Sequence, residues 1–271
     1  MSGVVLTQRH ATRQRLDMSA LLPEHLAGMS QQAIAALPLR LGRHQVDLGE
    51  LFDVAGTPDD ELLIRPCADN LDGIGRGMRN GRIRVAGDAG HRAGAGMRGG
   101  QIEIEGRAAD AAAEGMSGGT LLIGGDCGDR LGGPPPGERQ GMRGGLVRVR
   151  GNAGDRAAER QRRGILLVDG DCGDYAGVNM IAGTLVVLGQ SGAYCGWNMR
   201  RGTLLLTRAP RSRPGTFADN GLQRPGYLTL LLRALAASGA ALPVPTDGPP
   251  RVHRLLGDLA CGGLGEILIL A

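Results

Sequence analysis

The chain has 271 residues, a formal net charge of +4, 21% charged residues and only 2% aromatic residues. No apolar run is long enough to cross a bilayer, and residues 1–16 are too polar and Arg-rich for a signal peptide, so we expect a cytoplasmic protein with no membrane contact. Nucleic acid binding needs a basic stripe with stacking aromatic residues, which this composition does not supply, so no nucleic acid partner is expected.

Residues 1–54 are expected to cap the repeats that follow. Ser19 to Leu37 has a helical pattern that is broken near Pro23, and residues 39–41 and 45–48 have the pattern of short strands. A weak first coil is expected around Leu62 to Ile64. A cap is needed because the end of a stacked repeat exposes an unpaired strand edge.

A repeat of 19 residues dominates the chain from Gly77 to Leu206, and the segment Pro134 to Gln140 lengthens one copy. Each copy carries a G-M-x-x-G pattern or a close variant, followed by two apolar residues in alternation. Gln161 replaces the methionine once; the methionines are Met78, Met97, Met116, Met142, Met180 and Met199. The final glycine is present in every copy, at Gly81, Gly100, Gly119, Gly145, Gly164, Gly183 and Gly202. A fixed period near twenty predicts a stacked solenoid.

Each copy contains one strand with an inward apolar pair. The pairs are Ile83/Val85, Ile102/Ile104, Leu121/Ile123, Val147/Val149, Leu166/Val168, Leu185/Val187 and Leu204/Leu206. Nineteen residues are too few for a strand and a packed helix. The pattern therefore predicts an all-β fold, a single-stranded right-handed parallel β-helix with coils about 4.8 Å apart. Hexapeptide helices and calcium-binding nonapeptide repeats have other periods and are disfavoured.

Two columns of the repeat have expected structural roles. The methionines should form a ladder that fills one corner of the core. The turn glycines, at Gly87, Gly106, Gly125, Gly151, Gly170 and Gly189, should serve corners that need a positive φ or a close approach between stacked backbones.

The segment after the coils is expected to hold an irregular stretch from Thr207 to Pro225, an apolar helix from Tyr227 to Ser238 and a closing strand from Glu266 to Leu270. Outward strand positions of the late coils become apolar, and such a stripe must be covered. Two covers remain open at this point, the C-terminal helix and another subunit. The candidate subunit interface is formed by Ile165, Leu167, Val186, Leu188, Leu205, Leu228, Leu231 and Leu232.

The acidic and amide residues of the coils could suggest paired carboxylates. They recur at Asp110, Asp129, Asp155 and Asp174, and at Asp88, Asp126, Asn152 and Asp171. Because they recur in several coils, we expect them to cap their own turns rather than to act in catalysis. His91 occupies one of these positions.

The cysteines show no metal or disulfide pattern. Cys127 and Cys172 share one repeat position two coils apart, with Ala153 between them, which places them about 10 Å apart and beyond disulfide reach. No C-x-x-C spacing, nucleophile elbow or phosphate loop is present. We therefore predict no catalytic residue, no cofactor-binding residue and no metal ligand in this chain.

Several strings resemble the C-subunit of formylmethanofuran dehydrogenase, from about residue 37 to the end. They are L-G-E-L-F-D-V at 48–54, I-G-x-G-M at 74–78, N-M-x-x-G-T-L-V-V-L-G at 179–189 and the ending at 257–267. The coil repeat also resembles the G-x-G-x-G domain that closes the large subunit of glutamate synthase, where it is structural.

The resemblance implies a non-catalytic scaffold subunit in a larger enzyme. Archaeal relatives belong to a tungsten or molybdenum dehydrogenase. Bacterial ones belong to a formyltransferase/hydrolase complex that moves a formyl group from tetrahydromethanopterin to a methanofuran-type carrier and releases formate. Metals and C1 carriers are then expected on partner subunits, an amidohydrolase-like subunit and a formyltransferase subunit. All 31 basic residues are Arg, which suggests a GC-rich bacterial genome and favours the bacterial complex.

Some positions depart from the family pattern. Arg160 to Arg163 form a basic corner, and Leu264 stands where a Lys is expected; Ala109, Ala113 and Ala158 stand at Gly positions. The predicted organisation is a cap at 1–54, the coils at 55–207 and a C-terminal segment at 208–271. The rival hypotheses are a stand-alone polysaccharide-cleaving β-helix and a separately encoded glutamate-synthase-like domain.

Overall fold

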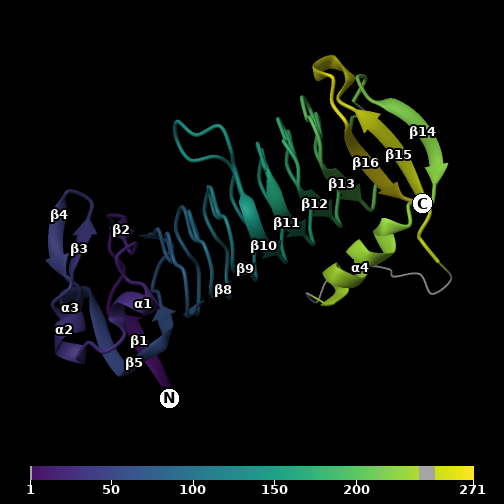
Figure 1. Cartoon of the computed structure of the whole chain (residues 1–271). Helices are drawn as coiled ribbons and strands as arrows, with labels where there is room; N and C mark the ends of the chain where they lie inside the picture. The colour runs from purple at the N-terminus through teal and green to yellow at the C-terminus, as the bar shows by residue number, and fades with distance from the viewer. Residues whose placement is uncertain (1, 213, 238–247) are drawn as a thin grey trace.

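The computed structural model describes residues 2–212, 214–237 and 248–271, and strands make up most of it. Twelve strands form one long mixed sheet in the order β1-β5-β7-β8-β9-β10-β11-β12-β13-β16-β15-β14, which does not close on itself; four short strands form a second sheet. Figure 1 shows the long sheet running through the molecule with helices at its two ends. The prediction of a strand-dominated fold is confirmed at this level. None of the helices in the described ranges has the length and apolar character that a bilayer span requires.

The N-terminal part begins with a strand that the sequence analysis did not predict. Strand β1 (Ser2–Gln8) pairs antiparallel with the long, bent strand β5 (Phe52–Arg65). Its short run Val4 to Leu6 gave no strand signal because polar residues and arginines surround it. Strand β1 covers the edge of β5 that would otherwise lack a partner, and its side chains Val4 and Leu6 are buried.

The rest of this part contains the predicted helical region and two short strands, with different bounds. The helical region consists of two short helices, α1 (Pro23–Leu26) and α2 (Gln31–Ala35), separated by residues 27–30. The predicted break near Pro23 is wrong, because proline is compatible with the first turn of a helix and Pro23 begins α1. Strands β3 (Pro38–Leu41) and β4 (His44–Asp47) form a hairpin, and α3 (Leu48–Leu51) leads into β5. Strand β3 also pairs with β2 (Leu16–Asp17), which runs parallel to β6 (Leu71–Asp72).

The repeats form a parallel ladder in which each inward side chain lies beside its copy one repeat later. The strands are β7 (Arg82–Val85), β8 (Gln101–Ile104), β9 (Thr120–Ile123), β10 (Arg143–Val149), β11 (Arg163–Val168), β12 (Thr184–Val187) and β13 (Thr203–Leu206). The weak coil predicted at Leu62 to Ile64 joins them through β5, which pairs parallel with β7. Every predicted inward pair is at most 1% exposed, so the alternating pattern located the core correctly.

A second line of parallel bridges runs along another side of the repeats. It joins Ala89, Ala108, Cys127, Ala153, Cys172 and Ser191 in that order. Ala153 lies between the two cysteines as predicted, and all five cysteines are free. Each repeat is therefore fixed to the next at two separate sides.

The methionine and glycine columns depend on each other. All six repeat methionines are fully buried, and each lies over the glycine of the following repeat. A Cβ on Gly119 would lie 2.6 Å from Met97 Cε and 2.8 Å from the carbonyl oxygen of Gly100. Gly119 also has φ +86°, so this position excludes a side chain for two reasons.

The C-terminal part returns to the sheet. Strand β16 (Gly265–Leu270) pairs parallel with β13, as the predicted closing strand should. Strands β14 (Ala218–Gln223) and β15 (Val252–Gly257) continue the sheet in antiparallel pairing; both were missed, β14 because its sequence is polar. Helix α4 (Tyr227–Ala237) is confirmed, and its predicted last residue, Ser238, lies outside the described residues.

Gln161 is the one polar member of the methionine column. It is fully buried; its Nε2 donates to the carbonyl oxygen of Gly164 at 2.9 Å, and its Oε1 has no partner among the described residues. The side chain takes the methionine's place over Gly183. A buried acceptor without a partner lowers stability by about 1–3 kcal/mol.

We therefore expect Gln161→Met to raise the free energy of unfolding by about 1–2 kcal/mol, because the methionine removes the unpartnered oxygen and keeps the volume. Urea denaturation followed by circular dichroism measures this. The reciprocal variant Met142→Gln, in the preceding repeat, should lower stability. Equal or lower stability of Gln161→Met would contradict the explanation.

Candidate functional site

Two lines of carboxylate and amide side chains run along the corners of the repeats. In the first, each carboxylate accepts the backbone N–H found one repeat later, at 2.7–3.0 Å; the acceptors are Asp72, Asp110, Asp129, Asp155 and Asp174. In the second, Asp88, Asp126, Asn152 and Asp171 do the same at 2.7–2.9 Å. The prediction that these side chains are structural agrees with these bonds, but the predicted hydrogen-bond partner was wrong. The side chains bond the next repeat instead of capping their own turns.

These ladders also explain part of the glycine pattern. A Cβ on Gly128 would collide with the carboxylate of Asp110, and one on Gly151 with that of Asp126. Neither glycine has a positive φ, so close approach, and not backbone freedom, is the reason for glycine here.

His91 and Arg107 interrupt the two ladders. The Nδ1 atom of His91 lies 3.8 Å from the Asp110 carboxylate, with both side chains nearly half exposed. Arg107 extends back to Asp69 at 2.9 Å and to Asp88 at 3.2 Å. Both interruptions lie next to the N-terminal cap, where the corner region is hollowed by a cavity.

This cavity, the cap groove, has a volume of about 510 Å³. It is lined by Arg15, Asp17, Arg40, Gly42, Asp72, Gly73, Arg76, His91, Arg92, Asp110, Ala111 and Arg130. The lining combines residues of β2, β3 and β6 with corners of three repeats, so the groove lies where the cap meets the stacked repeats.

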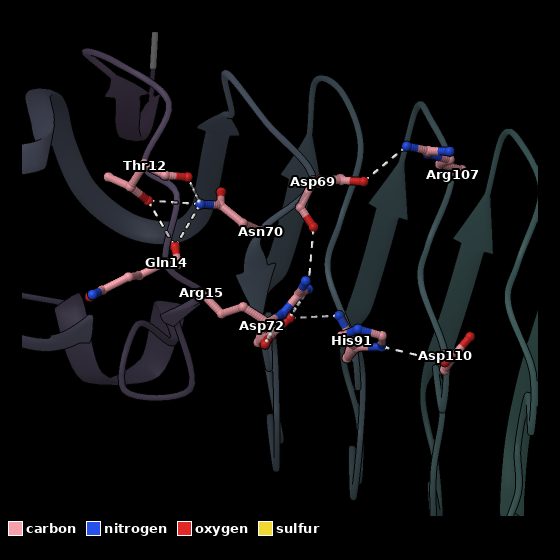
Figure 2. A network of polar contacts seen from close by, with 9 residues as sticks. All are labelled: Thr12, Gln14, Arg15, Asp69, Asn70, Asp72, His91, Arg107 and Asp110. Carbon is pink, nitrogen blue, oxygen red and sulfur yellow. Dashed lines mark hydrogen bonds and ion pairs between the residues drawn. The ribbon is translucent and has the colours of Figure 1, made fainter. Parts of the chain in front are cut away.

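A polar network holds the wall of the cap groove in place (Figure 2). Arg15 donates from Nε to Asp72 at 2.5 Å and makes a second, shorter bond to the same carboxylate, which in turn accepts the N–H of His91. Hydrogen bonding to Asp72 raises the pKa of Arg15 above its usual value. Asn70 donates to the carbonyl oxygens of Thr12 and Gln14 at 2.7 and 2.8 Å. The segment before β2 is thereby fixed to the first repeats.

The charges of the cap groove favour an anion. Five arginines face three aspartates, and within the described part of the chain Arg40, Arg76 and Arg130 make no ion pair, whereas Arg15 and Arg92 do. Guanidinium groups bind carboxylate and phosphate well. The lining of the groove contains neither cysteine nor serine.

The buried cysteines are poor nucleophiles. Burial raises the pKa of Cys127 and Cys195 to about 12 and raises that of Cys172 still further. A thiol acts as a nucleophile or metal ligand only as the thiolate. Across the described ranges, no group of three His, Cys, Asp or Glu side chains is placed to hold a metal ion.

The predicted interface residues are brought together, but as an internal contact. Leu167, Val186 and Leu205 are fully buried against α4, whose Leu228 and Leu232 are also fully buried. Ile165, Leu188 and Leu231 are partly buried at the border of the same cluster. The hypothesis that the C-terminal helix covers the stripe is confirmed. A role of these residues as a subunit interface stays a prediction, and it is confined to their exposed borders.

The cap groove was not predicted from the sequence, because its lining comes from segments far apart along the chain. The available signal was the interruption of the repeat at His91 and Arg107. His91 departs visibly from its column, but without the position of Arg15 its neighbourhood could not be inferred.

Comparisons with known proteins find a family that matches the repeats, curated relatives of part of the chain and a solved structure similar to nearly all of it. Residues 82–214 match the family described as "GXGXG motif". A crystal structure of the formyltransferase/hydrolase complex (FhcABCD) from Methylorubrum extorquens with methylofuran contains a similar chain, 35% identical, with a TM-score of 0.91; the alignment covers 98% of this chain and 99% of that one.

Two curated proteins match over shorter stretches. The C-subunit of the formyltransferase/hydrolase complex Fhc of M. extorquens is 36% identical over 79 residues, 29% of this chain and 30% of that protein. The C-subunit of molybdenum-containing formylmethanofuran dehydrogenase 1 of Methanothermobacter thermautotrophicus is 32% identical over 90 residues, 32% of this chain and 22% of that protein. The aligned stretches thus span less than a third of these two relatives.

Asp72→Ala should lower the free energy of unfolding by about 1–3 kcal/mol, because it leaves Arg15 and the N–H of His91 without their acceptor. The matched control is Asp69→Ala, which removes only an exposed ion pair and should change stability by less than about 1 kcal/mol. Urea denaturation measures both. Equal effects of the two substitutions would show that the Arg15–Asp72 contact does not hold the cap.

At pH 8 a thiol reagent should modify only Cys67 and Cys261 in the folded chain, because the other three thiols are buried and their pKa values are raised. Mass spectrometry of the alkylated protein counts the modified residues. Five should react after denaturation. Rapid labelling of Cys127 or Cys172 in the folded protein would contradict the structure.

Proposed function

The chain belongs to the family of formylmethanofuran dehydrogenase C-subunits, and from this membership we propose that it is the scaffold subunit of a formyltransferase/hydrolase complex. Such a complex moves a formyl group from tetrahydromethanopterin to a methanofuran-type carrier and releases formate. The observation that carries the proposal is the similarity to a chain of the FhcABCD structure along practically the full length of both chains.

The proposal includes the geometry of the scaffold. The stacked repeats form a right-handed parallel β-helix, which the in-register parallel strands and the second line of bridges support. A body of this kind is stiff, because each repeat is bonded to its neighbours on more than one side. Stiffness suits a subunit that holds two active sites at a constant distance.

Catalysis belongs, in this proposal, to an amidohydrolase-like subunit and a formyltransferase subunit, which also hold the metals and the C1 carriers. Two features of this chain support that division. Its ladder carboxylates are engaged with backbone N–H groups, and its buried thiols have raised pKa values. A cytoplasmic location is part of the same proposal.

The alternative is that the chain is the corresponding subunit of a tungsten- or molybdenum-containing formylmethanofuran dehydrogenase. Its support is the 32% identity to the archaeal protein over 90 residues. The hydrolytic complex is favoured because the match to its structure extends over 98% of the chain instead of 32%.

The test is purification of the tagged chain from its native host, followed by mass spectrometry and metal analysis. We expect formyltransferase and amidohydrolase-like subunits to accompany it in fixed proportion, without tungsten or molybdenum. A pterin-bound tungsten or molybdenum in the complex would establish the dehydrogenase alternative. A stable monomer without partners would overturn both.

A further inference from the structure

Three aromatic side chains gather at one exposed corner. Of six aromatic residues, both phenylalanines are buried, and three of the other four lie together late in the repeats. Tyr175 stacks on Tyr194 at 4.9 Å between ring centroids, and its edge meets Trp197 at 6.1 Å. Tyr194 and Trp197 are 54% and 53% exposed. We call these three residues the aromatic corner.

These tyrosines are not explained by folding. Tyr175 and Tyr194 have φ values of +60° and +57°, a left-handed conformation that lowers stability by about 1–2 kcal/mol in a residue with a side chain. The left-handed conformation belongs to this repeat position and does not require an aromatic side chain, because earlier repeats have Arg92, Ala111, Arg130 and Arg156 there, also at positive φ. Exposed aromatic side chains at positions that the repeat does not require to be aromatic indicate a role in binding.

A cationic hollow lies beside the aromatic corner. It has a volume of about 300 Å³, and its lining includes Arg139, Arg160 and Arg200 but no carboxylate. Asn179 and Asn198 also line it and connect it to the aromatic corner, because the N–H of Asn179 donates to the carbonyl oxygen of Trp197 at 2.9 Å.

Two interruptions of the repeat supply arginines to this hollow. Arg139 comes from the inserted segment that lengthens one repeat. Arg160 has φ +52°, where other repeats have Gly or Asn. Glu159 lies 3.9 Å from both Arg156 and Arg160 and is therefore shared between the two guanidinium groups. In the described part of the chain, Arg139 and Arg200 make no ion pair.

We propose that the aromatic corner and the cationic hollow form one docking surface for an acidic segment of another subunit of the complex; this rests on the proposed function. The occupant follows from charge complementarity: the hollow is lined by three arginines and no carboxylate, and Arg139 and Arg200 make no ion pair in the described part of the chain, so aspartate and glutamate side chains match it. Tyr, Trp and Arg are the residues that contribute most to protein interfaces. The Arg156 guanidinium, 6.0 Å from the Tyr175 ring centroid, extends the cationic character over the aromatic corner.

The experiment uses the complex assembled by co-expression with the formyltransferase and amidohydrolase-like subunits. Two double variants divide the surface: Tyr194→Ala with Trp197→Ala, and Arg160→Asn with Arg200→Gln. Ala and Asn occupy the corresponding left-handed positions in other repeats, at Ala111 and Asn179, so both variants should fold. Leu222→Ala, of similar exposure to Trp197, and Arg98→Gln, at the repeat position of Arg200, serve as controls.

The chain is titrated with the purified partner subunits, the formyltransferase and the amidohydrolase-like subunit. Each double variant should bind the subunit that carries the acidic segment at least ten-fold more weakly than wild type, and the controls should bind like wild type. Wild-type affinity should fall as salt rises, and the arginine variant should lose part of this dependence. Trp197 is the sole tryptophan, so 5-fluorotryptophan labelling gives one ¹⁹F signal, which should shift and lose its solvent exposure on assembly.

Normal binding by both variants, with the ¹⁹F signal unchanged in an assembled wild-type complex, would overturn the docking surface and leave the proposed function intact. A concentration-dependent ¹⁹F shift of the chain alone would also overturn it, because a second copy would then be the occupant. Failure of wild type to assemble with these subunits would refute the proposed function, and the docking surface with it.

Discussion

Each repeat of this chain depends on its neighbour for its hydrogen bonds, because a single short strand cannot pair with itself. The N–H and C=O groups of one repeat meet those of the next in 19-residue register along β7 to β9. A displaced repeat would lose these bonds and turn its inward side chains outward. The register is therefore the constraint from which the rest of the structure follows.

The repeated residues are consequences of that register. Stacked backbones come so close that Gly119 must accommodate the Met97 side chain of the preceding repeat, and Gly151 the Asp126 carboxylate. The carboxylate in turn binds the N–H of Asn152 one repeat later, which joins the corners as the strands join the sides. Glycine, methionine and aspartate recur because each belongs to a contact between repeats.

The sequence was sufficient to predict the repeats, helix α4 and the closing strand β16. The alternating pairs located the core, and the outward stripe at Leu167, Val186 and Leu205 indicated its cover by α4. Strands β1 and β14 were missed because their sequences lack that alternation, and their pairing partners lie far along the chain. The predicted hydrogen-bond partner of the ladder carboxylates was also wrong. Aspartate and asparagine are suited both to capping their own turn and to bonding the next repeat, so the residue type alone does not distinguish the two roles. The cap groove could not be derived, because Arg15 reaches Asp72 across 57 positions of sequence.

The contacts between repeats also determine where specific binding can develop in such a chain. Positions between repeats are occupied by the contacts that maintain the register, so variation is tolerated only at outer corners and at the ends. The interruptions of the repeat lie there: His91 and Arg107 beside the cap groove, Arg160 and the insertion beside the aromatic corner. Gln161 is the exception, because it departs from the pattern in the core and leaves an oxygen without a partner among the described residues.

A departure from the repeat pattern in the core lowers stability without changing the surface of the protein. A departure at a corner changes the surface and leaves the ladder intact, which makes the corners the positions at which one stacked repeat can acquire partners of its own.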